Sequence, residues 1–309
     1  MTELGLLLPS RESVLWAGGD LRLLVDAARS AEQGGYDSVW VGDSLLARPR
    51  GEPFSVLSAI AAVTTRARLG TAVLLPLLRH PLNLAHTAAS VDRIAGGRLV
   101  LGVGPGASVP GTDAELAALG SATGRRVEAM LQRLEQCRRL WRGEDPDAEL
   151  LPRPARPGGP PLWLGAHGPR MLRLAGRRFD GWLPFSPTAA DYATGLEAVR
   201  RAAEEAGRSP EQVVAGVYLT VAVADTAKRA AEDLDAYMRA YYGLPAEVMA
   251  RTQASHAGTL ESAGDWVAGY VGAGASHVVV RLARPTLDGY QDAAAKILAA
   301  LRSRTSPPH

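Results

Sequence analysis

The chain has 309 residues, of which 47% are hydrophobic, and its 34 basic residues nearly balance its 32 acidic residues. The resulting net charge of +2 gives no electrostatic footprint for nucleic acid or an anionic membrane, and no apolar run approaches the length of a membrane span. The length suits either two ordinary domains or one α/β barrel with insertions, and we expect a soluble, cytoplasmic protein.

Strand and helix patterns alternate from end to end. Short, mostly apolar segments predict eight strands, at 4–8, 38–41, 68–74, 98–103, 162–165, 181–184, 213–223 and 278–282. Segments with helical spacing predict helices at 20–33, 53–65, 81–94, 125–141, 169–176, 189–206, 226–242, 260–271 and 287–301. Eight βα units favour a (β/α)8 TIM barrel over a doubly wound sheet, with one domain over 1–303 and a flexible tail over 304–309.

Two connections are too long for simple turns. Residues 105–124 follow the fourth predicted strand and residues 243–259 follow the seventh, so both insertions lie at the C-terminal end of the barrel. Loops at that end carry the active site in this fold, and long loops there often act as lids. The single cysteine, Cys137, lies inside a predicted amphipathic helix and is expected to be a buried structural thiol.

Small residues mark the third and fourth predicted strands. The third begins with Gly70, Thr71 and Ala72, and the fourth opens into the run Gly104, Pro105 and Gly106. Two neighbouring parallel strands with such residues make a floor on which a flat ligand approaches the backbone closely.

Groups able to carry out acid or base chemistry are scarce at the strand ends. Asp43 and His167 stand out, with Ser10, Ser44 and Tyr218 as hydroxyl groups. A small, apolar site of this kind suits an organic cofactor that brings its own chemistry. The histidines have no HxH or HExxH spacing, so no metal site is expected.

Two of these positions have two readings each. The turn from Gly165 through Ala166, His167 and Gly168 to Arg170 precedes a helix and presents free amides, which favours an anion, but an ordinary βα turn has the same pattern. Asp43 is either a hydrogen-bond acceptor for a cofactor or substrate, or the cap of a short turn.

Five segments carry a resemblance to a known family. They are AEQGGYDSVWVGDSLLARPRGEP at 31–53, the core LGTAVLLPLLRHPLNLA to DRIAGGRLVLGVGPG at 69–106, RRVEAMLQRLEQCRRLWRGE at 125–144, PPLWLGAHGPRMLRLAGRRFDGWLP at 160–184, and GTLESAGDWVAGYVGAGASHVVVRL at 258–282. In this order the chain resembles the bacterial luciferase-like monooxygenase superfamily, and within it the branch that uses the deazaflavin coenzyme F420.

The resemblance implies a TIM barrel with a flavin-type ring on a bulge of the third strand. It implies a non-prolyl cis peptide at Ala72-Val73, after Thr71, beneath the ring. The other positions it assigns to the coenzyme are Asp43 and Ser44 at the ring edge, Gly104, Pro105 and Gly106 along the ribityl chain, and Ala166, His167 and Gly168 at the phosphate, with Arg170 beside them.

Two departures from the family pattern bear on the chemistry. Many relatives have histidine where this chain has Ser44, and the deazaflavin sugar-phosphate dehydrogenases have a catalytic glutamate where it has Ala107. Ser44 cannot act as an acid or base at neutral pH, so no catalytic residue is assigned, and Tyr218 or water is left as the proton source. Direct hydride transfer, which needs no strong acid or base from the protein, fits these residues best.

Three functional hypotheses follow. The first is an F420-dependent oxidoreductase that transfers a hydride between C5 of the deazaflavin and a small organic substrate. The alternatives are an FMN-dependent flavin monooxygenase on the same barrel and a non-catalytic flavin or deazaflavin carrier. Because relatives often pair through barrel helices, the resemblance also implies a homodimer.

Overall fold

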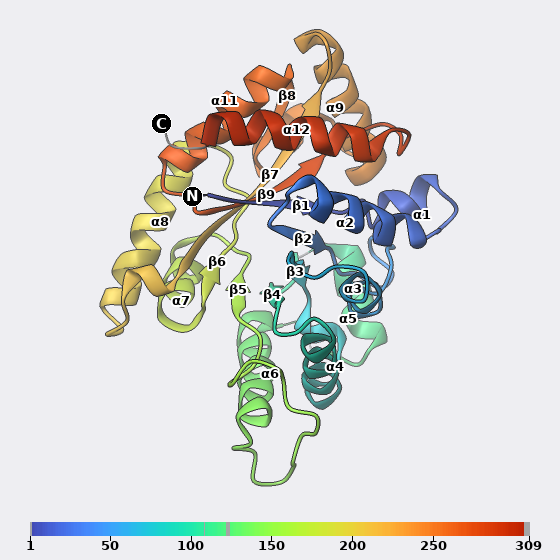
Figure 1. The fold of residues 1–309 in the computed structure, drawn as a ribbon. Coiled ribbons are helices and arrows are strands. Elements are labelled where there is room, and N and C mark those ends of the chain that lie inside the picture. The colour runs from blue at the N-terminus through green and yellow to red at the C-terminus, as the bar shows by residue number, and fades with distance from the viewer. Residues whose placement is uncertain (1, 108, 122–123, 306–309) are drawn as a thin grey trace.

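A closed parallel barrel forms the centre of the molecule (Figure 1). The computed structural model describes residues 2–107, 109–121 and 124–305. The barrel strands pair in chain order and the last pairs with the first; they are β1 (Glu3–Leu7), β2 (Ser38–Val41), β3 (Arg68–Leu74), β4 (Leu99–Val103), β5 (Leu162–Leu164), β6 (Gly181–Trp182), β7 (Val214–Val223) and β9 (His277–Leu282). The predicted TIM barrel is confirmed.

Helices surround the strands on the outside of the barrel (Figure 1). They are α2 (Arg22–Gly34), α3 (Pro53–Ala61), α4 (Pro81–Ile94), α6 (Arg126–Arg142), α7 (Pro169–Arg178), α8 (Ala189–Glu204), α11 (Leu260–Gly272) and α12 (Tyr290–Thr305). Helix α9 (Ala227–Tyr242) instead packs against β7 and β8 and reaches the open end of the barrel, because its tyrosine rings contact the inward-facing Arg281 on β9. Pro53, Pro81 and Pro169 each occupy the first helical turn, where a missing N–H costs nothing. Helix α12 continues two residues past the expected boundary at 303, and residues 306–309 lie outside the described part of the chain.

The two insertions contain regular structure where the sequence predicts long loops. Helix α5 (Pro110–Ala118) follows β4, and α10 (Ala246–Met249) and strand β8 (Ser255–Gly258) follow α9, the helix that comes after β7. Strand β8 pairs with the C-terminal half of β7, above the point where β6 pairs with its first residues. The barrel wall is therefore taller on this side. A further short helix, α1 (Glu12–Trp16), and the 3-10 turns η1 (Pro76–Leu78) and η2 (Pro210–Gln212) complete the fold.

Large side chains fill the interior of the barrel toward the N-terminal end of its strands. Its inward-facing core comprises Leu7, Trp40, Val100, Trp163, Leu183 and Val279. The rings of Trp40 and Trp163 lie 5.3 Å apart between centroids, and a Cβ on Gly70 would collide with the Trp40 ring. Because these large side chains close the N-terminal end, only the C-terminal end of the strands is left open for a ligand.

A buried series of hydrogen-bonded side chains lies next to these indoles, toward the N-terminal end of the barrel. His277 contacts Ser38 Oγ through Nε2 at 2.8 Å and Glu3 through Nδ1 at 2.7 Å, and Trp40 Nε1 donates to Ser38 Oγ at 2.7 Å. The order resembles a Ser-His-acid triad. However, Ser38 and His277 have no exposed surface, and this end of a TIM barrel contributes stability rather than catalysis. We assign these hydrogen-bonded side chains a structural role, which is to close the N-terminal end of the barrel.

Candidate coenzyme and substrate site

The open end of the barrel has a small, apolar floor over β3, β4 and β5. The pairing of β3 with β4 shifts between Thr71 and Leu74, and the peptide bond between Ala72 and Val73 is cis. Both side chains of that peptide are partly exposed, although they lie within a barrel strand. The floor is therefore accessible from the mouth of the barrel.

Two glycines keep the floor flat beside Val73. A Cβ on Gly104 would lie 2.9 Å from Val73 Cγ2, and a Cβ on Gly165 would lie 2.5 Å from Val73 Cγ1. Pro105, Gly106 and Ala166 continue this surface and are also partly exposed. A shallow surface without polar side chains fits one face of a flat aromatic ring.

Thr71 has a structural contact instead of a place in the mouth. Its side chain is fully buried, and its hydroxyl donates to the carbonyl oxygen of Gly102 at 2.8 Å. A Cβ on Gly102 would lie 2.1 Å from the Thr71 carbonyl oxygen, so glycine is required for this close approach of β3 and β4. Thr71 fixes the strand pair that carries the floor.

Asp43, directly after β2, holds the segment that follows β3. Its carboxylate accepts two hydrogen bonds from Arg79, at 2.6 and 3.0 Å, and one from the Leu75 amide at 2.9 Å. Arg79 also donates to Glu52 at 2.8 Å. Because the Asp43 side chain is fully buried in these bonds, it is directed at Arg79 and not at the open mouth. Its predicted place at the ring edge stays a prediction.

Ser44 faces a carboxylate that the sequence analysis does not identify. Glu115, on the inserted helix α5, is buried and accepts hydrogen bonds from Ser44 Oγ at 3.2 Å, from the Leu46 amide at 2.9 Å and from the Leu45 amide. Ser44 Oγ accepts from the Arg48 amide at 2.9 Å. Glu115 thus connects the insertion after β4 to the loop after β2, at the rim of the floor.

The turn after β5 presents unused backbone donors. Neither His167 nor Gly168 donates its amide to an acceptor within the described ranges, and the Arg170 amide lies in the first turn of α7. The positive end of that helix favours an anion here. The Arg170 side chain turns away and pairs with Glu128 on α6. The His167 ring packs edge-on against Phe185, and burial lowers its pKa.

Opposite the floor lie Tyr218 on β7 and Arg281 on β9. Both face the interior, and the guanidinium carbon of Arg281 lies 5.4 Å from the centre of the Tyr218 ring. Burial raises the pKa of Tyr218 well above its ordinary value, so the phenol keeps its proton and acts as a hydrogen-bond donor.

Two charged residues of this region, Arg79 and Glu115, have no role in the sequence-based prediction, whereas Arg281 is a candidate there because it ends a predicted strand. Arg79 donates to Asp43, which lies 36 positions earlier in the sequence, and Glu115 accepts from Ser44, which lies 71 positions earlier. No local sequence pattern predicts partners so far apart. Arg281 did leave a signal, since it is the one charged residue in the apolar strand HVVVRL.

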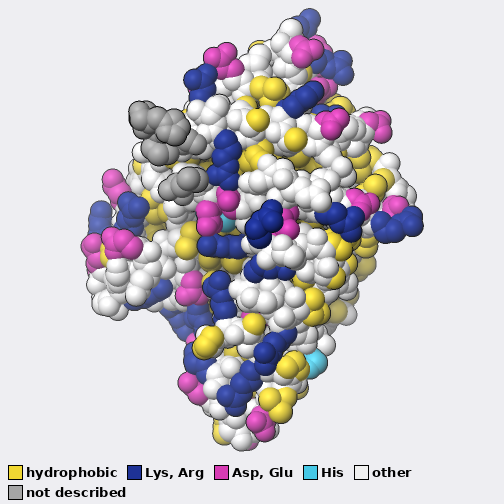
Figure 2. All heavy atoms as spheres, in the orientation of Figure 1, with side chains coloured by type: hydrophobic (Ala, Val, Ile, Leu, Met, Phe, Trp, Pro, Cys, Tyr) yellow, Lys and Arg dark blue, Asp and Glu magenta, His cyan; other side chains and the backbone are white. Residues whose placement is uncertain are grey.

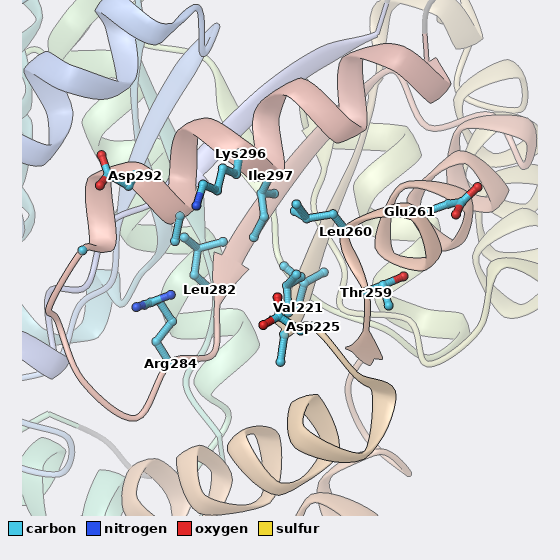
Figure 3. Close-up of a pocket in the computed structure, with 14 residues that line it drawn as sticks. Val221, Asp225, Thr259, Leu260, Glu261, Leu282, Arg284, Asp292, Lys296 and Ile297 are labelled. Atoms are coloured by element: carbon cyan, nitrogen blue, oxygen red, sulfur yellow. The ribbon is translucent and has the colours of Figure 1, made fainter.

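A separate cavity of about 650 Å³ lies outside the barrel wall (Figure 3). It is lined by the outward-facing Val221 and Leu282 and by residues of α11 and α12. Lys296, Arg284 and Asp292 stand around it, so its rim carries charges of both signs. Acidic and basic side chains are likewise interspersed on the face seen in Figure 2.

Two further properties concern the whole described chain. Across residues 2–107, 109–121 and 124–305, no helix combines the length and the apolar content that crossing a membrane requires. Within the same ranges, no three His, Cys, Asp or Glu side chains are grouped so that they could hold a metal ion.

The chain matches a protein-family model over residues 2–278, that of the luciferase-like monooxygenases. A 5,10-methylenetetrahydromethanopterin reductase from Methanolobus tindarius is 30% identical over 234 residues, which cover 72% of this chain and 69% of the relative. An F420-dependent glucose-6-phosphate dehydrogenase from Nakamurella multipartita is 33% identical over 230 residues, covering 68% of this chain and 66% of that protein.

Solved structures share the fold. An F420-dependent secondary alcohol dehydrogenase in complex with an F420-acetone adduct superposes with a TM-score of 0.80 at 19% identity, covering 97% of this chain and 99% of that one. A riboflavin lyase solved with modified FMN gives a TM-score of 0.76 at 17% identity, covering 98% and 92%. At these identities the likeness supports the fold alone.

The family model, the named relatives and the barrel fold all indicate a luciferase-like enzyme. Because the family and the named relatives are enzymes, the carrier hypothesis is set aside. The chain belongs to the luciferase-like monooxygenase family and is an oxidoreductase built on a TIM barrel.

Proposed function

We propose that this protein is an F420-dependent oxidoreductase that transfers a hydride between the deazaflavin C5 and a small organic substrate. The observation that carries the proposal is the flat floor made by the partly exposed Ala72, Val73 and Gly165, with the buried Gly104 between their strands. Relatives named as F420-dependent support the choice of coenzyme.

Each part of the mouth has a separate task in this proposal. F420, when bound, supplies the hydride chemistry. The floor binds one face of the ring, and the free amides of His167 and Gly168 bind the phosphate. Asp43 and Arg79 hold the segment after β3 in place.

Proton transfer, in contrast, has few candidates among the described residues. Tyr218 is protonated and partly exposed on the side of the mouth opposite the floor, so it donates a hydrogen bond to a substrate oxygen. Ser44 already contacts Glu115 and Arg48, and its part is to position the rim. The protein mainly orients the reactants and excludes water.

FMN is the second candidate coenzyme. The family model is named for monooxygenases, and a neighbour in fold was solved with modified FMN. The apolar floor suits an isoalloxazine ring as well as a deazaflavin ring.

A transfer experiment separates the two. The protein is mixed anaerobically with reduced F420 carrying deuterium at C5 and a panel of small ketones, aldehydes and alkenes, and products are analysed by mass spectrometry. One deuterium per product, with no oxygen consumed in the aerobic repeat, is expected. Turnover that requires oxygen and reduced FMN, with no deuterium transferred, overturns the proposal.

A homodimer also belongs to the proposal. Helix α3 offers no large apolar contact from these positions, because Phe54, Val56 and Leu57 are buried inside the molecule. Helix α4 instead exposes two large hydrophobic side chains, with Leu82 45% and Ile94 54% exposed. We place the dimer contact on α4.

A further inference from the structure

Arg281 is buried in the barrel mouth without a full set of partners. The residue is 2% exposed, its Nε donates to Thr220 Oγ1 at 3.2 Å, and its Nη1 donates to Tyr242 Oη at 2.8 Å. Its Nη2 is buried and has no hydrogen-bond partner in the structure. Arg281 forms no ion pair with any described residue.

Aromatic rings enclose the guanidinium in place of carboxylates. The centres of four tyrosine rings lie 4.9 to 5.4 Å from its central carbon, those of Tyr218, Tyr237, Tyr241 and Tyr242. Cation–π contacts offset part of the cost of burying the charge, but they do not satisfy an N–H group.

Neighbouring arginines add to the positive charge. The Arg11 guanidinium lies 4.5 Å from the centre of the Tyr241 ring, and its Nε and Nη1 are also buried without partners. Arg50 donates to Tyr241 Oη at 3.4 Å. The nearby acidic side chain is Glu12, whose carboxylate is engaged by the Tyr237 hydroxyl. Three cations against one carboxylate leave the cluster with an excess of positive charge.

The position of this cluster separates it from the expected coenzyme phosphate. In the closed barrel, β9 pairs with β1 and β7, while the floor lies on β3, β4 and β5 across the mouth. The free amides of the turn after β5 lie on the floor side. An anion at Arg281 is therefore on the substrate side of the mouth.

We infer that the substrate carries an oxyanion, a carboxylate, sulfonate or phosphate, which the free Nη2 of Arg281 binds between the tyrosine rings. A guanidinium N–H paired with an anionic oxygen makes a strong, charge-assisted bond. The aromatic walls favour an anion attached to a flat or apolar body over a free inorganic ion. This inference rests on the proposed function for the meaning of "substrate", but anion binding itself needs no coenzyme.

The test measures binding of benzoate, benzenesulfonate and phenyl phosphate to the coenzyme-free protein by ligand-observed NMR. Benzamide serves as the neutral probe and inorganic phosphate as the bare ion. We expect saturable binding of at least one aromatic anion, with benzamide and inorganic phosphate at least tenfold weaker. Arg281→Met should weaken that anion about 10- to 100-fold and leave benzamide unchanged.

Two variants keep the result decisive. Arg281→Lys retains the charge but loses the planar fork, and its affinity should fall between those of the wild type and Arg281→Met. Arg177→Met removes an exposed arginine on α7 and should change nothing. Equal binding of benzoate and benzamide by the wild type, or full anion affinity in folded Arg281→Met, overturns the inference. A protein that binds the anion but not F420 would refute the proposed function alone.

Discussion

Glu115 connects the insertion after β4 to the rim of the site, and its removal should destabilise the protein measurably. In Glu115→Ala three donors lose their acceptor, the Ser44 hydroxyl and the amides of Leu45 and Leu46. A buried donor left without a partner costs about 1 to 3 kcal/mol. Leu45 and Leu46 are 40% and 70% exposed, so water can replace part of these bonds.

Three such donors would cost about 3 kcal/mol at the least if all were buried, and because water replaces part of the bonds we expect Glu115→Ala to lower the free energy of unfolding by about 2 to 3 kcal/mol. The assay is urea unfolding followed by tryptophan fluorescence. Glu115→Gln keeps one acceptor oxygen, so its free energy of unfolding should fall by about half as much. Limited proteolysis should also cut Glu115→Ala earlier between β4 and α6, because α5 loses its anchor.

The matched control is Glu261→Ala on α11. Its side chain is 76% exposed and pairs with Arg304 at the surface, so the change should cost less than about 0.5 kcal/mol. If the free energy of unfolding of Glu115→Ala lies within about 0.5 kcal/mol of the wild-type value, Glu115 does not anchor the insertion, because the loss of a buried acceptor of three donors must cost more than that.

Three further predictions use other parts of the molecule. Burial raises the pKa of Cys137 to about 12, so the native thiol should resist a disulfide reagent at pH 8 and react once urea unfolds the chain; rapid labelling of native protein contradicts this. Ser38→Ala deprives Trp40 Nε1 of its acceptor and should cost about 1 to 3 kcal/mol of stability in a thermal or urea melt, whereas an unchanged melt would show that the hydrogen-bonded side chains next to the indoles are dispensable. Leu82→Glu with Ile94→Glu should convert a dimer into a folded monomer by light scattering, and a dimer that persists would place the contact elsewhere.

The fold could be predicted from the sequence because its signals are local. Apolar runs such as 99–103 and proline-initiated helices such as 81–94 identify their own elements, and eight alternating units leave few architectures. Strand β8 shows the limit. Its four residues, SHAG, have no strand pattern and form a strand only because they pair with Thr220 to Val223.

The candidate site divides in the same way. Its small residues, Gly104 and Gly165 among them, are visible in the sequence because they follow predicted strands. The partners of the polar residues are not, since Asp43 meets Arg79 and Ser44 meets Glu115 only through the closed barrel and the inserted helix. Long-range contacts of this kind depend on the three-dimensional fold and leave no periodic signal.

A parallel titration with the two candidate coenzymes tests whether the protein is selective for F420. F420 and FMN are titrated separately into the wild type, Gly165→Val and Gly34→Ala. A Cβ at Gly165 would crowd Val73, while a Cβ at Gly34 meets nothing within 4 Å. We predict saturable F420 binding, at least tenfold weaker in Gly165→Val and unchanged in Gly34→Ala. Tight binding of FMN with none of F420 would show that the protein is not F420-dependent, and equal F420 affinity in all three proteins would show that the ring does not bind at Val73 and Gly165.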